Sequence, residues 1–598
     1  MSNQEDLFKN LISHCKEYGF IFQSSEIYDG LSAIYDYGQN GVLLKNNIRQ
    51  YWWQSMVQLN ENIVGIDAAI FMHPTTWKAS GHVDAFSDPL IDNKDSKKRY
   101  RADVLIEEHV AKIEAKIEKE VEKAAKRFEG FDEKMFRSTN ARVLEYQKNV
   151  DDINARFKKA LNENDLAEVK QIIVDSDIVC AISGSKNWTD VRQFNLMFST
   201  QMSAVSENEN VPKDKNEQIL YKLFKESPDS VVKIEKTPEE LTSLGFDLNS
   251  LRSREVTPDQ FLEMTQYKCG KYSLDLINNI FNQKQKYVIE REQQNLLYLR
   301  PETAQGIFVN FLNVQKTGRM KIPFGIAQTG KAFRNEIVAR QFIFRMREFE
   351  QMEMQFFIRP GTQKEWYEHW KQTRLKWHNA LGIDEKKKRF HDHIKLAHYA
   401  DAACDIEFEF PFGFKELEGI HSRTDFDLRN HEQYSGKKQQ YFDPELNQSY
   451  TPYVIETSIG LDRMFLAIMA SSLKEEKLED GSERVVLSIP AALAPVKAAV
   501  FPLMGKDGMP EKAMEIMNML KLDYNCLYEE KDNIGKRYRR QDAIGTPYCI
   551  TVDQQSLEDN TVTIRDRDTM KQDRVAIDAI PVLIAEKVSL KSLLKKLV

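Results

Sequence analysis

The sequence lacks paired cysteines and long apolar runs. Its cysteines are scattered singly, with no CxxC pair, which excludes a disulfide framework and a zinc site built from cysteines. The six are Cys15, Cys180, Cys269, Cys404, Cys526 and Cys549. No run approaches the roughly 18 apolar residues that cross a bilayer, and the first twenty residues contain no signal-like hydrophobic region. We therefore expect a cytoplasmic protein without a membrane partner.

A strong excess of charge is also missing. Hydrophobic residues make up 41% of the chain and charged residues 29%, close to the average for folded soluble proteins. The 598 residues predict about three to five domains, at roughly 100 to 200 residues each. The net charge of -7 means that any contact with nucleic acid must depend on local basic patches.

Two insertions interrupt the chain. Residues 103–172 are rich in Lys, Glu and Ala and predict a helical arm, because apolar residues recur at the spacing of one helix face. These are Val110, Ile113, Ile117, Val121, Ala124 and Phe128. The arm is either a solvated charged element or a surface that contacts tRNA. Residues 201–285 contain a polar, proline-bearing stretch and predict a second insertion.

Strand patterns dominate the middle of the chain. The segments 321–328 and 342–358 predict two long antiparallel strands, and 453–457 predicts a strand that leads into a helix from about 461 to 473. After Pro490, short apolar strands alternate with helices and predict a separate α/β unit. Its expected elements are 498–503, 510–520, 524–528, 534–544, 548–552 and 561–565.

One glycine-rich segment resembles a phosphate-binding loop but fails in detail. Residues 325–332 nearly spell GxxxxGK[ST], yet Ala332 stands where a hydroxyl should bind Mg²⁺. The segment also lies among strand-like residues. We therefore interpret it as part of a strand.

Alternation along 344–356 separates two faces of a predicted strand. Arg345, Arg347, Phe349, Gln351 and Glu353 share one face, and the methionines share the other. The charged face fits either a solvated sheet surface or a nucleotide site, where guanidinium groups bind phosphate, a ring stacks on the base and an acid accepts from an amine.

A family resemblance favours the nucleotide site. Residues 333–336 (FRNE) and 345–349 (RMREF) resemble motif 2 of class II aminoacyl-tRNA synthetases, and 460–463 (GLDR) resembles motif 3. Residues 35–47, 192–198, 299–306 (LRPETAQG) and 456–458 are together similar to the dimeric glycyl-tRNA synthetases. The matching segments run from about residue 20 to 585, apart from the insertions.

The resemblance implies an α+β fold and a defined activity. It implies a class II catalytic domain over 1–488, with an antiparallel sheet flanked by helices, and an anticodon-binding domain over 489–598. The implied homodimer uses ATP and Mg²⁺ to make glycyl-adenylate and pyrophosphate, and then transfers glycine to the terminal adenosine of tRNA(Gly).

The resemblance also assigns site residues. Arg334 and Arg463 are the expected catalytic residues, and Glu416 is the expected Mg²⁺ ligand, although it also fits a surface acid. The expected ATP-binding residues are Arg334, Asn335, Glu336, Phe344, Arg345, Phe349, Glu416, Leu417, Gly460 and Arg463. The expected glycine-binding residues are Arg101, Glu302, Glu353, Glu456 and Ser458. For Glu302 and Glu456, core or helix-capping acids are the alternative.

In the C-terminal unit, a basic run with an aromatic residue inside it is the expected tRNA contact. It comprises Lys536, Arg537, Arg539 and Arg540. Composition alone favours a solvated basic helix face, and the resemblance of the surrounding domain reverses that preference. The chain departs from the family at two places: Gln39-Asn40 replaces Pro-Leu near motif 1, and only Cys180 remains of a CPxCG knuckle. One thiol cannot complete a cysteine-based zinc site, so no zinc is expected.

Two rival functions remain open. A synthetase-like binding protein without catalysis would lack the motif arginines, all of which are present here. A ligase for another amino acid would have a different amino-acid pocket.

Overall fold

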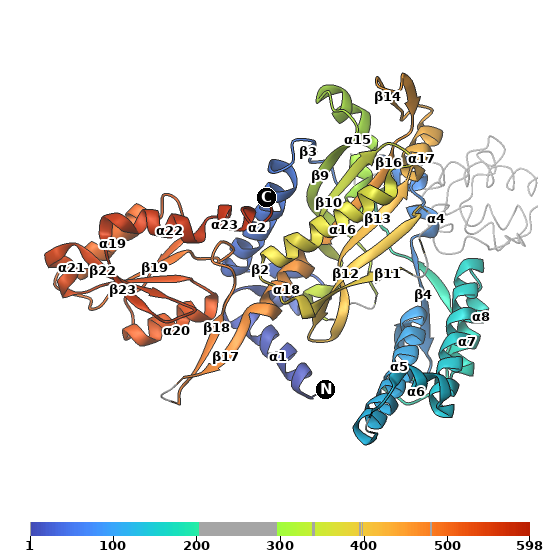
Figure 1. Ribbon diagram of the computed structural model, residues 1–598, viewed down its shortest axis with the longest axis horizontal. Coiled ribbons are helices and arrows are strands. Elements are labelled where there is room, and N and C mark those ends of the chain that lie inside the picture. Colours follow the sequence, from blue (N-terminus) through green and yellow to red (C-terminus); the bar gives the residue numbers. More distant parts are fainter. Residues whose placement is uncertain are drawn as a thin grey trace, which may run out of the picture. The chain divides into compact units, whose positions relative to one another are not determined.

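The computed structural model describes residues 2–128, 130–201, 296–337, 341–393, 396, 399–478 and 481–598 (Figure 1). Residues 1–70, 75–198 and 300–598 are grouped in one compact unit, and residues 71–74 and 199–299 fall outside it. Apart from Gln201, the predicted second insertion lies outside the described residues. Among the described helices, none is both long and apolar enough to cross a membrane.

Seven strands form the main sheet of the larger unit, in the spatial order β11-β12-β13-β16-β10-β9-β3. All neighbouring strands are antiparallel except β3 and β9, which run parallel. The strands are β3 (Ile63–Gly65), β9 (Phe324–Phe333), β10 (Glu348–Ile358), β11 (Lys388–Asp392), β12 (Ala402–Phe410), β13 (Gly413–Thr424) and β16 (Tyr453–Gly460).

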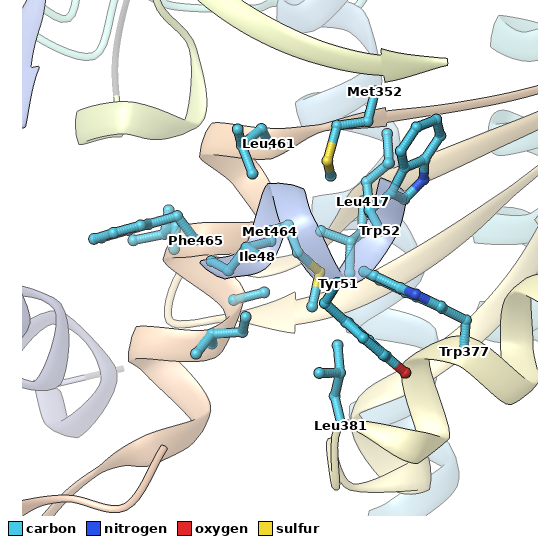
Figure 2. Packing of buried hydrophobic residues seen from close by; sticks show 14 of the residues in the cluster. Ile48, Tyr51, Trp52, Met352, Trp377, Leu381, Leu417, Leu461, Met464 and Phe465 are labelled. Atoms are coloured by element: carbon cyan, nitrogen blue, oxygen red, sulfur yellow. The ribbon is translucent and has the colours of Figure 1, made fainter. Parts of the chain in front are cut away.

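A hydrophobic core joins this sheet to three helices, α2 (Gln39–Trp53), α16 (Gln363–Ala380) and α18 (Leu461–Ser472). Figure 2 shows Trp52 of α2, Trp377 of α16 and Met464 of α18 around Met352 of β10. Each of these side chains is at most 1% exposed. Burying one such side chain stabilises the fold by about 1.5–3 kcal/mol, so β10 is firmly held from this face.

β9 and β10 are strands as predicted, but they begin or end at other residues than expected. β9 and β10 are long and antiparallel, as expected. The predicted second strand starts too early, because Phe342–Phe344 forms a 3₁₀ turn and β10 begins at Glu348. The first strand extends to Phe333, so the glycine-rich segment 325–332 lies wholly in β9 and is no phosphate loop. The predicted strand and helix after residue 453 are confirmed by β16 and α18.

The predicted arm is helical and contains four helices. They are α5 (Ala102–Arg127), α6 (Glu133–Thr139), α7 (Ala141–Glu163) and α8 (Leu166–Asp175). The expected apolar face of α5 is buried from Val110 to Ala124. Phe128 was wrongly included in that face: α5 ends before it, and its side chain is 56% exposed.

The C-terminal residues form a five-stranded sheet in the order β20-β19-β21-β22-β23, coloured orange to red in Figure 1. Its strands are β19 (Ala498–Pro502), β20 (Cys526–Tyr528), β21 (Tyr548–Val552), β22 (Thr561–Asp566) and β23 (Gln572–Ala576). Its helices are α19 (Met509–Leu520), α20 (Ile534–Ile544), α21 (Gln554–Asp559), α22 (Ile580–Val588) and α23 (Lys591–Leu594). The predicted α/β alternation is confirmed within two residues at each end.

The remaining α-helices and β-strands of the described residues are as follows. The helices are α1 (Ser2–Glu17), α3 (Pro74–Ala79), α4 (His82–Ala85), α15 (Ala304–Thr317) and α17 (Phe426–Ser435). The strands are β1 (Ile21–Gln23), β2 (Tyr35–Tyr37), β4 (Ser87–Asn93), β5 (Lys98–Arg101), β6 (Arg192–Asn195), β7 (Phe198–Gln201), β8 (Leu296–Leu299), β14 (Tyr441–Asp443), β15 (Gln448–Tyr450), β17 (Leu473–Lys477) and β18 (Glu483–Leu487).

Candidate active site

A cavity of about 280 Å³ lies against the charged face of the central sheet. Side chains from β10, β13 and β16, from the segment between β9 and β10, and from the start of α18 line it. All predicted ATP and glycine residues except Arg101, Asn335 and Leu417 line this cavity. Those that do are Glu302, Arg334, Glu336, Phe344, Arg345, Phe349, Glu353, Glu416, Glu456, Ser458, Gly460 and Arg463.

Strand alternation places β10 residues as predicted. Phe349, Gln351 and Glu353 line the cavity, whereas Met352 and Met354 belong to the hydrophobic core on the other face. One carboxylate does lie on the core face and is 6% exposed. This is Glu350, which pairs with Arg49 at 2.6 Å and Lys45 at 3.4 Å. Both cations come from α2, so the motif 1 region neutralises the acid behind the cavity.

Four arginines line the cavity, and three of them belong to the predicted motifs. Arg334 lies over the Phe349 ring at 5.3 Å and donates to the Pro301 carbonyl at 3.0 Å. Arg463, near the N-terminus of α18, lies over the Phe344 ring at 4.5 Å. With Arg345, these groups form a positively charged wall. Guanidinium forks and a helix N-terminus are both favourable for phosphate.

Carboxylates face these cations. Arg463 Nη1 is 2.9 Å from Glu416 Oε2 and lowers the pKa of Glu416 to about 2. Arg345 Nη1 is 3.7 Å from Glu336 Oε2. Among the described residues, no donor reaches hydrogen-bonding distance of this buried oxygen. Glu336 therefore offers a free acceptor at the cavity wall, because buried polar atoms normally have a partner.

Two of the three glycine-site acids have cationic or imidazole neighbours. Glu456 accepts from Arg423 at 2.9 Å and lies 2.9 Å from His421 Nδ1. Burial by itself raises the pKa of Glu456, but Arg423 and His421 stabilise its charged form and lower the pKa to about 2. Burial opposes ionisation of Glu302 too, yet His82, 3.3 Å away, lowers the pKa of Glu302 below its ordinary value.

Glu353 differs from both. Its carboxylate accepts from the Thr303 and Ser458 hydroxyls, the latter at 2.7 Å, and has no cationic partner among the described residues. Burial, together with repulsion from Glu456 and Glu302, raises the pKa of Glu353 to about 8. The cavity thus contains one buried acid that a bound cation would stabilise in its charged form.

Comparison with known proteins agrees with this geometry. Family models match the glycyl-tRNA synthetase insertion domain 1 at residues 88–196, the class II tRNA synthetase core domain (G, H, P, S and T) at 287–472, and an anticodon binding domain at 497–587. The chain is 43% identical over 579 residues to the glycine–tRNA ligase of Chlorobaculum tepidum, covering 96% of this chain and 99% of the relative. The chain belongs to the glycine–tRNA ligase family.

Other members of the family match equally fully. The glycine–tRNA ligases of Macrococcus caseolyticus and Clostridium kluyveri are 41% and 42% identical over 586 residues, each covering 98% of this chain and 99% of the relative. A solved structure of Giardia lamblia prolyl-tRNA synthetase in complex with prolyl-adenylate covers 100% of this chain and 80% of its own at 13% identity. The TM-score is 0.49.

Three predicted family positions do not line the cavity. Leu417 is 1% exposed and points into the core in Figure 2. It is the extra residue of a β-bulge, since Glu416 pairs with Glu407 while Glu418 pairs with Ile406. The bulge turns Glu416 toward the cavity and Leu417 away from it. The Leu417 side chain therefore does not face the cavity, and the assignment of Leu417 to ATP binding stays a prediction.

Arg101 and Asn335 lie beside the cavity without lining it. Arg101 pairs with Asp88 at 3.0 Å and with Asp103 at 2.6 Å, so its charge is already neutralised. The Asn335 backbone NH donates to the Leu196 carbonyl at 2.8 Å. In this conformation Arg101 does not reach the glycine-site acids.

Of the four residues predicted to contact tRNA, the three arginines already bind other groups of the protein. Arg537 is 2% exposed and donates to the Pro502 carbonyl at 2.6 Å, so the predicted exposure to tRNA is wrong for this side chain. Arg539 donates to the Glu483 carbonyl at 3.0 Å. Arg540 is ion-paired with acids of the same domain. Lys536 is exposed and 3.9 Å from its nearest acid, Asp532.

Sequence reasoning missed other cavity residues. His393, Tyr399, Asp405, His421 and Arg423 all line it. Two of them lie on β13, where they alternate with buried residues of the other face. The period-two pattern used for β10 also applies to this part of β13 and would have identified them.

Proposed function

We propose that this chain ligates glycine to tRNA(Gly) in two steps. The first step makes glycyl-adenylate and pyrophosphate from glycine and ATP, and the second transfers glycine to the 3′-terminal adenosine. The observation that carries the proposal is one cavity in which three motif arginines face a buried cluster of acids. Arginines suit a triphosphate, and the acids suit an ammonium group.

The nucleotide would lie on β10 and the motif 2 segment. Glu336 Oε2 accepts no hydrogen bond from a described residue, so it offers an acceptor for the adenine amine. The Phe349 ring offers a stacking surface, and Arg345 and Arg463 would bind the outer phosphates. Each role uses a group already present at the cavity wall.

Adenylate formation needs positioning and charge stabilisation. A glycine carboxylate oxygen attacks the α-phosphorus, a P–O bond forms, and the bond to the β-phosphate oxygen breaks as pyrophosphate leaves. The carboxylate is already ionised, so no general base is required. Arg334 would hold the carboxylate and the α-phosphate together and stabilise the charge that develops between them.

A magnesium ion fits the cavity through Glu416. Its carboxylate is half exposed, lines the cavity and offers the hard oxygen that Mg²⁺ prefers. Bound with ATP, Mg²⁺ neutralises phosphate charge. We propose Glu416 as its protein ligand, with phosphate oxygens and water as the others.

The acid cluster would select glycine by charge and by size. Glu302, Glu353 and Glu456 would surround the ammonium group. Ser458, hydrogen-bonded to Glu353, would stand close to the α-carbon and exclude larger side chains. Steric overlap discriminates more strongly than the roughly 1–3 kcal/mol available from a missing methylene group.

We also propose that residues 1–488 act as the catalytic domain and 489–598 as the anticodon-binding domain, within a cytoplasmic homodimer. The family models support a class II core in the first region and an anticodon-binding domain in the second, and they leave the domain boundaries open. We propose the dimer because the region around α2 resembles motif 1 of the family. Light scattering on the purified chain would test the dimer directly.

Exchange of labelled pyrophosphate into ATP tests the activity. We expect exchange that depends on glycine. Faster exchange with alanine or serine would identify a ligase for another amino acid. A complete lack of exchange, with tRNA binding retained, would identify a binding protein without catalysis.

A further inference from the structure

Three side chains to which no direct contact with ATP or glycine is assigned lie together at the cavity wall. His393 follows β11, Asp405 lies on β12 and His421 lies on β13. One nitrogen or oxygen of each lies within 4.8 Å of the others. The closest pair, His393 Nε2 and Asp405 Oδ2, is 2.9 Å apart. All three are partly buried and line the cavity.

The orientation of the His421 ring leaves one nitrogen available. Its Nδ1 is 2.9 Å from Glu456 Oε1, and an ionised carboxylate can only accept, so Nδ1 carries the proton. Nε2 of the neutral ring then has a free lone pair. A carboxylate that holds the far nitrogen of an imidazole is the usual support of a metal-binding histidine.

A glycine keeps the space between these groups open. A Cβ atom built on Gly419 would lie 3.2 Å from His421 Nε2 and 3.7 Å from Asp405 Oδ1. Gly419 does not have the positive φ that would itself require glycine. The absence of a side chain at Gly419 therefore leaves open the space beside His421 Nε2 and Asp405 Oδ1.

We propose that His393, Asp405 and His421 bind a transition-metal dication of the zinc class. Two imidazoles and one carboxylate favour Zn²⁺, Co²⁺ or Ni²⁺ over Mg²⁺ and Ca²⁺, which prefer oxygen ligands. Ligand atoms around tetrahedral zinc are about 3.3 Å apart, so the widest pair here would close by about 1.5 Å at most.

The site would be open toward the cavity. Three protein ligands leave a coordination position for water or for an oxygen of a bound ligand. The cation would also fix the His421 ring and, through it, the Glu456 carboxylate. This site is separate from the cysteine knuckle, whose loss led to the expectation of no zinc, because it contains no cysteine.

The experiment uses the full-length protein after treatment with a chelator. Zn²⁺ is titrated in the absence of glycine, ATP and tRNA, so the result does not depend on the proposed ligase activity. Co²⁺ serves as a second probe because its visible absorption reports histidine and carboxylate coordination. We expect one equivalent of Zn²⁺ per chain, and a Co²⁺ spectrum that added Zn²⁺ abolishes.

The variants His393→Ala and Asp405→Asn should each weaken Zn²⁺ binding more than tenfold. The matched control is His391→Ala, which removes a neighbouring histidine that is 53% exposed and lies outside the cluster. Gly419→Ala should weaken binding without removing any ligand. If the wild type binds no Zn²⁺, or if His393→Ala and His391→Ala bind it equally well, the three residues form only an ion pair with a neighbouring imidazole. Thermal melting of each variant checks its folding.

Discussion

The hydroxyl of Ser458 donates a 2.7 Å hydrogen bond to Glu353 Oε1 across the antiparallel pair β16 and β10. The two residues are direct register partners, so their side chains must share one face of the sheet. The sheet thus fixes the relative position of the hydroxyl and the carboxylate, which are the two groups proposed to recognise the glycine ammonium group and its α-carbon.

Glycine binding should tighten as the pH rises toward 8. The raised pKa of Glu353, about 8, keeps this carboxyl protonated at neutral pH. A bound ammonium group lowers that pKa, so the proton leaves as glycine binds. Below pH 8 the glycine Kd should therefore fall about tenfold per pH unit, and above pH 8 it should level off. Calorimetry in buffers of different ionisation enthalpy would measure both Kd and the released proton.

The matched variant is Glu353→Gln, which keeps the shape and removes the charge. It should bind glycine more weakly at pH 8 and release no proton. A wild-type Kd that stays constant between pH 6 and 8 would contradict the assigned role of Glu353.

Replacing Arg334 should abolish most adenylate formation. Arg334→Ala removes the fork proposed to stabilise the transition state, and we expect glycine-dependent pyrophosphate exchange to fall by about 10²–10³-fold or more. Arg334→Lys should recover little of it, since a point charge cannot bridge two oxygens. The measurement is the exchange rate at saturating glycine and ATP.

Lys331→Ala provides the control for Arg334. Lys331 belongs to the GK pair of the apparent phosphate loop, but it lies exposed on β9 and pairs with Glu348 at 2.6 Å. Its removal should leave exchange nearly unchanged. If Lys331→Ala impaired exchange as much as Arg334→Ala, the glycine-rich segment would need a new interpretation.

The alternation of side chains along a strand predicted the nucleotide side of the cavity. It did not predict the residues of a strand that a bulge interrupts. On β10, uninterrupted alternation placed Phe349 and Glu353 correctly. On β13, the bulge at Leu417 breaks the period of two between Glu416 and Glu418. Alternation beyond the bulge places His421 and Arg423, but it does not extend to Glu416. His393 follows β11 and Asp405 lies on β12, and the pairing of these strands in the sheet brings the two residues together.

Composition also failed for the basic helix α20. Arg537, Gln541 and Ile544 are buried at the spacing of one helix face. This face of α20 therefore packs against the domain, and Arg537 is buried with it. Arginine is seldom buried unless its donors are satisfied, and here backbone carbonyls accept from it. Within the run itself, no local signal distinguishes this arginine from the other basic residues.

Glu418→Gln should destabilise the protein strongly. Glu418 is fully buried and pairs with two residues of α16. These are Arg374 and His378, whose Nε2 lies 2.7 Å from the Glu418 carboxylate. Losing this charge leaves the buried guanidinium without its counter-ion, which typically costs about 3–5 kcal/mol. Chemical denaturation would measure the free energy of unfolding.

The control for Glu418 is Glu368→Gln on the exposed side of α16, where the carboxylate pairs loosely with Lys371 at 3.8 Å. Exposed pairs contribute about 0–1 kcal/mol, so its unfolding midpoint should hardly change. Equal effects of the two substitutions would show that the buried cluster does not stabilise the fold as an ion pair.

The two basic residues Lys536 and Arg537 should separate tRNA binding from folding. Lys536 is exposed, so Lys536→Ala should raise the KM for tRNA(Gly) by about threefold to tenfold through one lost phosphate contact, and leave pyrophosphate exchange unchanged. Arg537→Ala should instead lower the unfolding midpoint, because the Pro502 carbonyl loses its buried donor. Aminoacylation kinetics and thermal melting of both variants would provide the comparison. A normal KM in Lys536→Ala, or a normal midpoint in Arg537→Ala, would reverse the assignment for that residue.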